Sequence, residues 1–223
     1  GLRVYVANRD SSSISVINAE TQAVLETISS SDNISINGPI ALTESADGSY
    51  LFIANIFSNT VAVLDTQSNS LIKTITIDSN PASLQVMDSG DSEKLYVANS
   101  YSNSISVITI TDSDPANWQS EQTISVNAHP QGLILDKHGY LYASHEGSKT
   151  ISVIDTDSNT VISSVNLTVT PFRLNLSADN RHLFVGEFTY SGANGVTVID
   201  TELARTNPAQ AELHRWSDIG TGN

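Results

Sequence analysis

Short apolar runs separated by polar residues recur along this chain every 42 to 47 residues. The clearest copy pairs Leu95-Tyr96-Val97 with Ile105-Ser106-Val107-Ile108, which begins ten residues later. Runs of this length, rich in β-branched and aromatic residues and bounded by Asn, Ser, Asp and Gly, predict β-strands. A period in this range with only short apolar runs favours β-propeller blades over helical repeats. The five copies begin at Val4, Leu51, Leu95, Leu141 and Leu183.

Each copy predicts up to four strands, which we name A to D in chain order. The aromatic triplet is the B strand, the second apolar run is the C strand, and a D strand follows it. A strand that begins with proline, the A strand, precedes B in four copies, at 39–43, 81–86, 130–135 and 171–176. Proline is tolerated at the first residue of a strand, where no ladder hydrogen bond is lost. The last D strand is expected within 211–219.

The predicted fold is therefore all-β, a β-propeller of four-stranded antiparallel blades with about five blades visible. We predict one repeat domain over 1–223, with blades at about 1–37, 38–80, 81–129, 130–170 and 171–223. The first blade lacks an A strand, and too few residues follow the last D strand to supply it. Three arrangements stay open: an excerpt of a ring of about seven blades, a five-bladed unit, or open edges that pair with another chain.

Composition narrows the choice of partners. The net charge of −14 and the pI of about 4.4 argue against binding nucleic acid or anionic membranes electrostatically. The absence of cysteine excludes disulfides and thiolate metal sites. No apolar run reaches the roughly 18 residues needed to span a membrane. Because the sequence starts with Gly1 rather than Met, we expect a mature or trimmed piece of a longer chain.

The copies differ most in their loops. The step from the B to the C strand is 10 residues in four copies but 13 in the fifth, which expands 188–195. The third copy has five extra residues within 112–118, including Asp112 and Asp114, which we keep as a candidate cation site. Loops on a rigid scaffold carry function more often than strands do. The aromatic residues in or beside these loops could anchor a partner: Phe57, Tyr101, Trp118 and Tyr190.

One position breaks the repeat in a way that suggests chemistry. The residue two places after the B-strand triplet is Asn in three copies, where it is expected to bond backbone in the following turn. In the last two copies it is His145 and Glu187. Blade symmetry would bring these two onto one face, near His129 and Arg173, with Tyr190 in the expanded loop. Such a set could bind a metal or an acidic ligand, and the alternative is ordinary variation on a polar face.

Other motifs are weaker. Asp155-Thr156-Asp157-Ser158-Asn159 resembles the start of a calcium loop, but the required Gly and distal Glu are missing, so a turn between the C and D strands is favoured. The sequence has no Gly-x-Ser-x-Gly, His-Glu-x-x-His or phosphate-binding glycine loop. Three Asn-x-Ser/Thr triplets are candidate N-glycosylation sites: Asn33, Asn166 and Asn175.

The strings 95–108 and 58–66 resemble the YVTN-type β-propeller repeat, in which a Tyr-Val-Thr-Asn-like strand leads to a Ser-Asn-Thr-Val-Ser-Val-Ile-Asp-Thr segment. The resemblance covers essentially the whole chain, and the fifth copy departs most, with Gly186-Glu187 in place of Ala-Asn. It implies a propeller, commonly of about seven blades, frequently exported and found in surface-layer, cell-surface and periplasmic proteins. The repeat residues are structural and bring no catalytic residues with them.

The sequence therefore favours a non-enzymatic extracellular or cell-surface β-propeller, a structural, adhesive or protein-interaction module, with a periplasmic location as the alternative. Its expected partners are other protein chains or a cell-surface polymer, with self-assembly through open blade edges. No cofactor is predicted, beyond a cation that stays open. The alternative function is a ligand-binding or enzymatic propeller of the lactonase or quinoprotein sort. It would need carboxylates and histidines that converge on the disk face; the candidates are Glu44, His129, Arg173 and Glu187.

Overall fold

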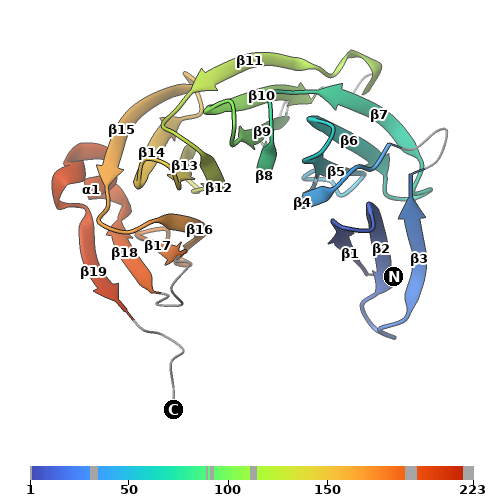
Figure 1. The fold of residues 1–223 in the computed structure, drawn as a ribbon, viewed down its shortest axis with the longest axis horizontal. Helices are drawn as coiled ribbons and strands as arrows, with labels where there is room; N and C mark the ends of the chain where they lie inside the picture. Colours follow the sequence, from blue (N-terminus) through green and yellow to red (C-terminus); the bar gives the residue numbers. More distant parts are fainter. Residues whose placement is uncertain are drawn as a thin grey trace. The chain divides into compact units, whose positions relative to one another are not determined.

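The computed structural model describes residues 2–30, 35–88, 90, 93–110, 115–188 and 195–217. The chain forms two compact units: unit 1 contains 1–102 and 106–123, and unit 2 contains 103–105 and 124–223. The five predicted blades appear as five antiparallel sheets with strands in chain order (Figure 1). The prediction of one domain over 1–223 with the stated blade limits stays a prediction.

Unit 1 contains the first two sheets and most of the third. Sheet 1 has three strands: β1 (Arg3–Asn8), β2 (Ser13–Asn18) and β3 (Val24–Ser29). Sheet 2 contains β4 (Pro39–Glu44), β5 (Tyr50–Asn55), β6 (Thr60–Asp65) and β7 (Leu71–Thr76). Sheet 3 contains β8 (Pro81–Asp88), β9 (Glu93–Asn99), β10 (Ser104–Ile110) and β11 (Ser120–Ser125), with the 3₁₀ turn η1 (Pro115–Asn117) before β11.

Unit 2 contains the remaining two sheets. Sheet 4 contains β12 (Pro130–Leu135), β13 (Tyr140–His145), β14 (Thr150–Asp155) and β15 (Thr160–Asn166). Sheet 5 contains β16 (Pro171–Leu176), β17 (His182–Glu187), β18 (Val196–Asp200) and β19 (Glu212–Trp216). The last strand lies within the predicted range. Between β18 and β19 the chain forms α1 (Thr201–Thr206) and the 3₁₀ turn η2 (Pro208–Gln210).

The expected A strands begin at proline and pair with the B strands in one register. Each proline lies opposite the last residue of its B strand, and the register shifts just after it. In the turns from A to B, Gly48 and Gly139 have φ of +73° and +82°, which L-residues with a Cβ rarely adopt. The first blade has no A strand among the described residues, as expected.

The core lies between neighbouring sheets inside each unit. One apolar cluster joins sheets 1 and 2 and includes Ile14 and Leu64. A second joins sheets 2 and 3, where Trp118 is buried and packs edge-on against Tyr50, with ring centroids 5.0 Å apart. A third joins sheets 4 and 5. Inner strands packed on both faces explain the apolar runs of the B and C strands.

Helix α1 was not foreseen, because six residues are too few to show a helical period. Asp200 caps its first turn: the backbone N–H of Leu203 donates to the Asp200 side chain at 2.8 Å. The helix packs on β15 of the neighbouring sheet, where the Ser163 hydroxyl donates to the carbonyl of Ala204 at 2.5 Å. The segment between the last C and D strands therefore links sheet 5 to sheet 4.

Candidate functional site

The asparagines at the end of the B strands bond neighbouring strands and loops. The Asn99 amide donates to the Ser106 hydroxyl on β10 at 2.9 Å, and the Asn8 amide donates to Ser13 and Ser15 on β2. For Asn8 this corrects the expectation of a bond to the backbone of the following turn. The reason is that Asn8 pairs in register with Ser13, so its amide lies against the hydroxyls of β2.

His145 occupies this position in sheet 4 and is fully buried. Neither of its ring nitrogens has a hydrogen-bond partner, and the buried hydroxyl of Ser152 has none either. Ser152 occupies the place that Ser106 has in sheet 3. Because His145 replaces the asparagine, the hydrogen bond that Asn99 makes to Ser106 has no counterpart between His145 and Ser152. Burial lowers the pKa of His145 from 6.5 to about 4, and the nearby backbone of Asn127 offsets only part of that effect. The imidazole is therefore neutral at pH 7.

Glu187 occupies the same position in sheet 5, and its side chain is fully covered. Arg215 of β19 binds it with two bonds of 2.8 Å, from Nε to Oε1 and from Nη2 to Oε2. The Thr197 hydroxyl donates to Oε1 at 3.0 Å. A two-pronged guanidinium–carboxylate pair is the strong form of this contact, so the charge of Glu187 is balanced inside the sheet and three of its about four acceptor sites are occupied.

Gly195 leaves the space that this ion pair needs. A Cβ at this residue would lie 2.6 Å from Oε2 of Glu187 and 2.5 Å from the carbonyl oxygen of Trp216. Both distances are shorter than real Cβ contacts. The backbone carbonyl of Gly195 also accepts the N–H of Glu187 at 3.0 Å. Gly195, the last residue of the expanded fifth loop, therefore leaves room for the ion pair between Glu187 and Arg215.

The other predicted site residues have the following surroundings. His129 is exposed, with φ of +57°, and its ring lies over Gly147, where a Cβ would come within 2.5 Å of its Cδ2. Arg173 is exposed, with its guanidinium 4.8 Å from the centroid of the Phe172 ring. Tyr190 lies outside the described residues. None of the contacts among the described residues joins His145 to Glu187, and the proposed grouping stays a prediction.

The calcium-like string forms an ordinary turn between the C and D strands of sheet 4. Asp155 Oδ1 accepts the backbone N–H of Asp157 at 2.9 Å and of Ser158 at 3.1 Å, which is the expected turn. Asp112 and Asp114, the second candidate for a cation, lie outside the described residues. Within the described part of the chain no three His, Cys, Asp or Glu side chains gather as a metal site would require.

The candidate glycosylation sites are exposed where the structure describes them, which is at Asn166 and Asn175. Asn33 lies outside the described residues. Modification at all three stays a prediction.

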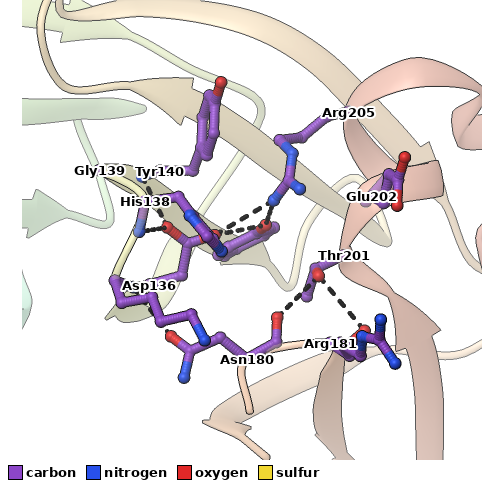
Figure 2. Close-up of polar contacts among 12 residues, drawn as sticks. Asp136, His138, Gly139, Tyr140, Asn180, Arg181, Thr201, Glu202 and Arg205 are labelled. Atoms are coloured by element: carbon purple, nitrogen blue, oxygen red, sulfur yellow. Dashed lines mark hydrogen bonds and ion pairs between the residues drawn. The ribbon is translucent and has the colours of Figure 1, made fainter.

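A second buried carboxylate with several partners is Asp136, in the turn between β12 and β13 (Figure 2). Its Oδ1 accepts the N–H groups of His138 and Tyr140 at 2.8 and 3.0 Å. Its Oδ2 accepts the Tyr142 hydroxyl at 3.1 Å and Arg205 Nη1 at 3.2 Å. Arg205 Nη1 also donates to the Tyr142 hydroxyl at 3.0 Å.

This network joins sheets 4 and 5 within unit 2. Arg205 comes from α1, and its guanidinium lies 4.7 Å from the centroid of the Tyr140 ring. Burial and the Asp136 charge raise the pKa of the Tyr142 phenol, which stays protonated and donates to the carboxylate. Thr201 donates to the carbonyl of Asn180 at 2.8 Å (Figure 2). Thr201 also lines an open pocket of about 320 Å³. The network is closed on itself, which indicates a structural role.

Sequence reasoning missed this network, although one signal was present. The turn from A to B begins with Ser45 in sheet 2 and Ser177 in sheet 5, and each hydroxyl accepts the N–H of the first residue of its B strand. Asp136 makes the same bond with one oxygen and has a second oxygen to spare. Because Asp136 replaces a serine of the repeat, its extra charge would have predicted a basic partner. The sequence does not show that this partner is Arg205.

Two aromatic side chains are strongly exposed on the turns between B and C strands in unit 1. Phe57 is 57% exposed and Tyr101 is 70% exposed, and each is the second residue after the B-strand asparagine. Phe57 lies against Gly38, and the guanidinium of Arg9 stands 5.5 Å from the centroid of its ring. Because sheets 2 and 3 pack side by side, the two rings share one face of unit 1.

Comparison with known proteins shows the fold. Hydrazine synthase from Kuenenia stuttgartiensis matches with a TM-score of 0.75 and 21% identity, over 89% of this chain and 60% of that one. A functionally unknown protein from Desulfotomaculum acetoxidans matches with a TM-score of 0.78 and 12% identity, over 96% of this chain and 66% of that one. Virginiamycin B lyase from Staphylococcus aureus matches with a TM-score of 0.73 and 17% identity, over 96% of this chain and 66% of that one. This chain therefore spans about two thirds or less of each of these three chains.

These likenesses, with the five antiparallel sheets, establish a β-propeller fold. At these identities they say nothing about activity. No protein-family model matches the chain, and no curated protein matches it. Among the described residues, no helix has the length and apolar character required to cross a membrane.

Proposed function

We propose that this chain is a non-enzymatic binding module of the YVTN-type propeller group, which works outside the cell or at its surface. It binds another protein or a cell-surface polymer through the turns that carry Phe57 and Tyr101. The observation that carries the proposal is the exposure of these two rings at equivalent places on neighbouring blades. Aromatic rings with an exposed face are typical anchors for sugars and for protein partners.

The surroundings of Phe57 suit an anchor. Contact with Gly38 and the Arg9 guanidinium holds the ring in one place, so little side-chain entropy is lost on binding. Beside it, Asn8, Arg9, Asp10 and Ser11 line a shallow depression of about 430 Å³ and offer both donors and acceptors. A mixed apolar and polar face of this kind is typical of interfaces.

The location outside the cell rests on the YVTN-like strings and on the low charged fraction of 15%, which leaves a surface rich in Ser, Thr and Asn. Labelling intact cells with an impermeant amine reagent tests it. Protection of the protein until the cells are lysed would contradict this part of the proposal.

The function is tested with a double variant, Phe57→Ser with Tyr101→Ser, in sedimentation with insoluble peptidoglycan, chitin and cellulose. We expect the native chain to bind at least one polymer and the variant to bind it about tenfold more weakly or worse. Trp216→Ser removes an exposed aromatic from β19 of unit 2 and serves as the matched control. Equal binding by both variants would contradict the assignment of this face.

The alternative is a ligand-binding or enzymatic propeller, and its support is that solved structures of the same fold include a synthase and a lyase. Against it, Glu187 is held by Arg215 and Thr197, and Asp136 by Arg205. Metal analysis of the purified protein separates the two proposals: a stoichiometric cation would favour the alternative.

A further inference from the structure

The turn that carries Phe57 is bonded to the segment that leads into sheet 3. This segment, 78–80, joins β7 to β8. The backbone N–H of Asn80 donates to Oδ1 of Asn59 at 2.8 Å, and the N–H of Ile77 donates to the carbonyl of Asn59 at 3.1 Å. Asn59 is the second residue after Phe57, so these bonds hold the Phe57 turn against the segment 78–80.

The turn that carries Tyr101 is bonded to the same segment. The backbone N–H of Tyr101 donates to the carbonyl of Ser79 at 3.3 Å. The N–H of Ser79 donates in return to the hydroxyl of Ser102 at 2.8 Å. The segment 78–80 therefore fixes the two aromatic turns of unit 1 relative to each other, and little ordering is needed before both rings contact one ligand.

The two rings are about one sheet spacing apart. Phe57 and Tyr101 hold equivalent places on sheets 2 and 3, which share one apolar core. Packed sheets lie about 10 Å apart, so equivalent turn residues on these two blades repeat at about this distance. In an extended β-1,4-linked glycan every second sugar has the same orientation, and this disaccharide repeat has about the same length.

The two rings differ in how far they project, and the cause is local. A Cβ at Gly38 would overlap the Phe57 ring, which lies over this glycine. In sheet 3 the place of Gly38 is taken by Asn80, whose side chain fills that space. Tyr101 is therefore displaced outward, in agreement with its exposure of 70% against 57% for Phe57.

Sheet 4 keeps a ring at the same place but supplies it from the other loop. There a glycine, Gly147, replaces the turn aromatic, and His129 replaces the glycine before the proline. The His129 ring lies over Gly147, as the Phe57 ring lies over Gly38 in sheet 2. A ring at this place is thus a recurring feature of the blades.

The surface around the two rings of unit 1 is polar but almost uncharged. It is formed by the segments 56–59, 78–80 and 100–102, in which the single charged residue is Asp78. Ser79 and Ser102 are exposed there. An anionic polymer would find no cation in these segments and would be repelled by the net charge of −14. Hydroxyl and amide groups instead match the hydroxyls of a neutral sugar.

This surface is less suited to a protein partner. Protein interfaces have a continuous apolar centre from which water is excluded. Here the two exposed rings are separated by Asp78, Ser79 and Asn80, so each ring is an isolated apolar area. A glycan has this alternation itself, because its pyranose faces are apolar and its edges carry hydroxyls.

We propose that the ligand of the Phe57 and Tyr101 turns is a neutral, extended β-1,4-linked glycan. One sugar stacks on Phe57, the next but one stacks on Tyr101, and the sugar between them bonds the polar groups of the segment 78–80. This inference rests on the proposed function, because it names the ligand class of the same face.

The first test varies the length of the ligand. Cello-oligosaccharides and chito-oligosaccharides of two to six sugars are titrated into the full 223-residue chain and followed by calorimetry and NMR. Three sugars are the shortest length that reaches both rings, so in at least one series the affinity should rise about tenfold or more from two sugars to three and much less with each further sugar. An even gain with every sugar would overturn the two-ring arrangement.

Protein variants test the contribution of each ring. Phe57→Ser and Tyr101→Ser should each remove the step between two and three sugars, whereas Tyr101→Phe keeps a ring and should retain it. Both side chains are exposed, so the melting temperature should stay unchanged. A step that persists in both serine variants would overturn the inference.

Matched glycans test the linkage and the charge. Maltohexaose, whose α-1,4 linkages curve the chain, should bind about tenfold more weakly than the better of cellohexaose and chitohexaose, and carboxymethylcellulose more weakly than the neutral hydroxyethylcellulose. Ring-dependent binding of an α-linked glycan, an anionic polymer or a protein alone would overturn this ligand class and leave the proposed function standing. If no polymer or protein binds in a way that depends on the two rings, the proposed function fails as well.

Discussion

His145 and Glu187 occupy the same place in neighbouring sheets, yet they have opposite electrostatic characters. Both stand at the end of a B strand, where sheet 3 has Asn99. In sheet 5 the C and D strands provide Thr197 and Arg215, which lie opposite each other, and the buried group is an ionised carboxylate. In sheet 4 the same two places hold Ser152 and Ser164, and the buried group is an imidazole without a partner.

The repeat therefore determines that the last residue of these B strands is buried. The side chains of the C and D strands determine whether that residue can carry a charge. A buried carboxylate requires a cation in contact. A buried imidazolium would require an anion in contact, and without one His145 remains neutral, as its lowered pKa indicates. The two sheets therefore respond to different perturbations.

The largest effect is expected from Arg215→Met, which leaves Glu187 buried without its cation. The free energy of unfolding should fall by about 3 to 4 kcal/mol at pH 7, measured by urea denaturation. Arg173→Met is the matched control on β16, where the arginine is exposed and rests on Phe172, and it should cost about 0.5 kcal/mol or less. Equal losses in the two variants would mean that the ion pair adds nothing.

The next effect is a pH dependence that belongs to sheet 4. The folded pKa of His145, about 4, is below its ordinary value of 6.5, so the unfolded chain takes up a proton first as the pH falls. The contribution of His145 to the free energy of unfolding is fully present above pH 6.5. It is lost between pH 6.5 and 4, and the total loss is about 3 kcal/mol. The pKa values of Asp47 and Asp179 are lowered from 3.8 by hydrogen bonds to serine, so their contributions are lost only below about pH 4.

Urea denaturation at several pH values measures this slope, and the variant His145→Asn should lack it. If the slope between pH 6.5 and 4 persists in the variant, another group is responsible and the assignment to His145 is wrong.

The smallest effect comes from converting sheet 4 to the pattern of sheet 3. His145→Asn at pH 7 should restore a hydrogen bond to Ser152, as Asn99 makes to Ser106, and raise the free energy of unfolding by about 1 kcal/mol. Adding Ser152→Ala should remove the gain, whereas Ser152→Ala alone should be close to neutral because its hydroxyl has no partner. A gain that survives the second substitution would point to packing instead.

Much of the architecture could be predicted because it is local. The apolar runs, the proline at the start of each A strand and the glycines of the turns each act over a few residues. Repetition turns them into blades. The candidate site could be predicted only in part. His145 and Glu187 are recognisable because they replace the repeated Asn, but the sequence does not show which residues contact them.

The sequence by itself determined the strand order, the register signals and the positions that break the repeat, because these follow from side-chain period and turn chemistry. Only the tertiary structure decided what each exceptional residue does. Arg215 reaches Glu187 across 28 residues, and Arg205 reaches Asp136 across 69. Such pairs depend on which strands become neighbours and how much water they exclude, and no pattern along the chain carries that information.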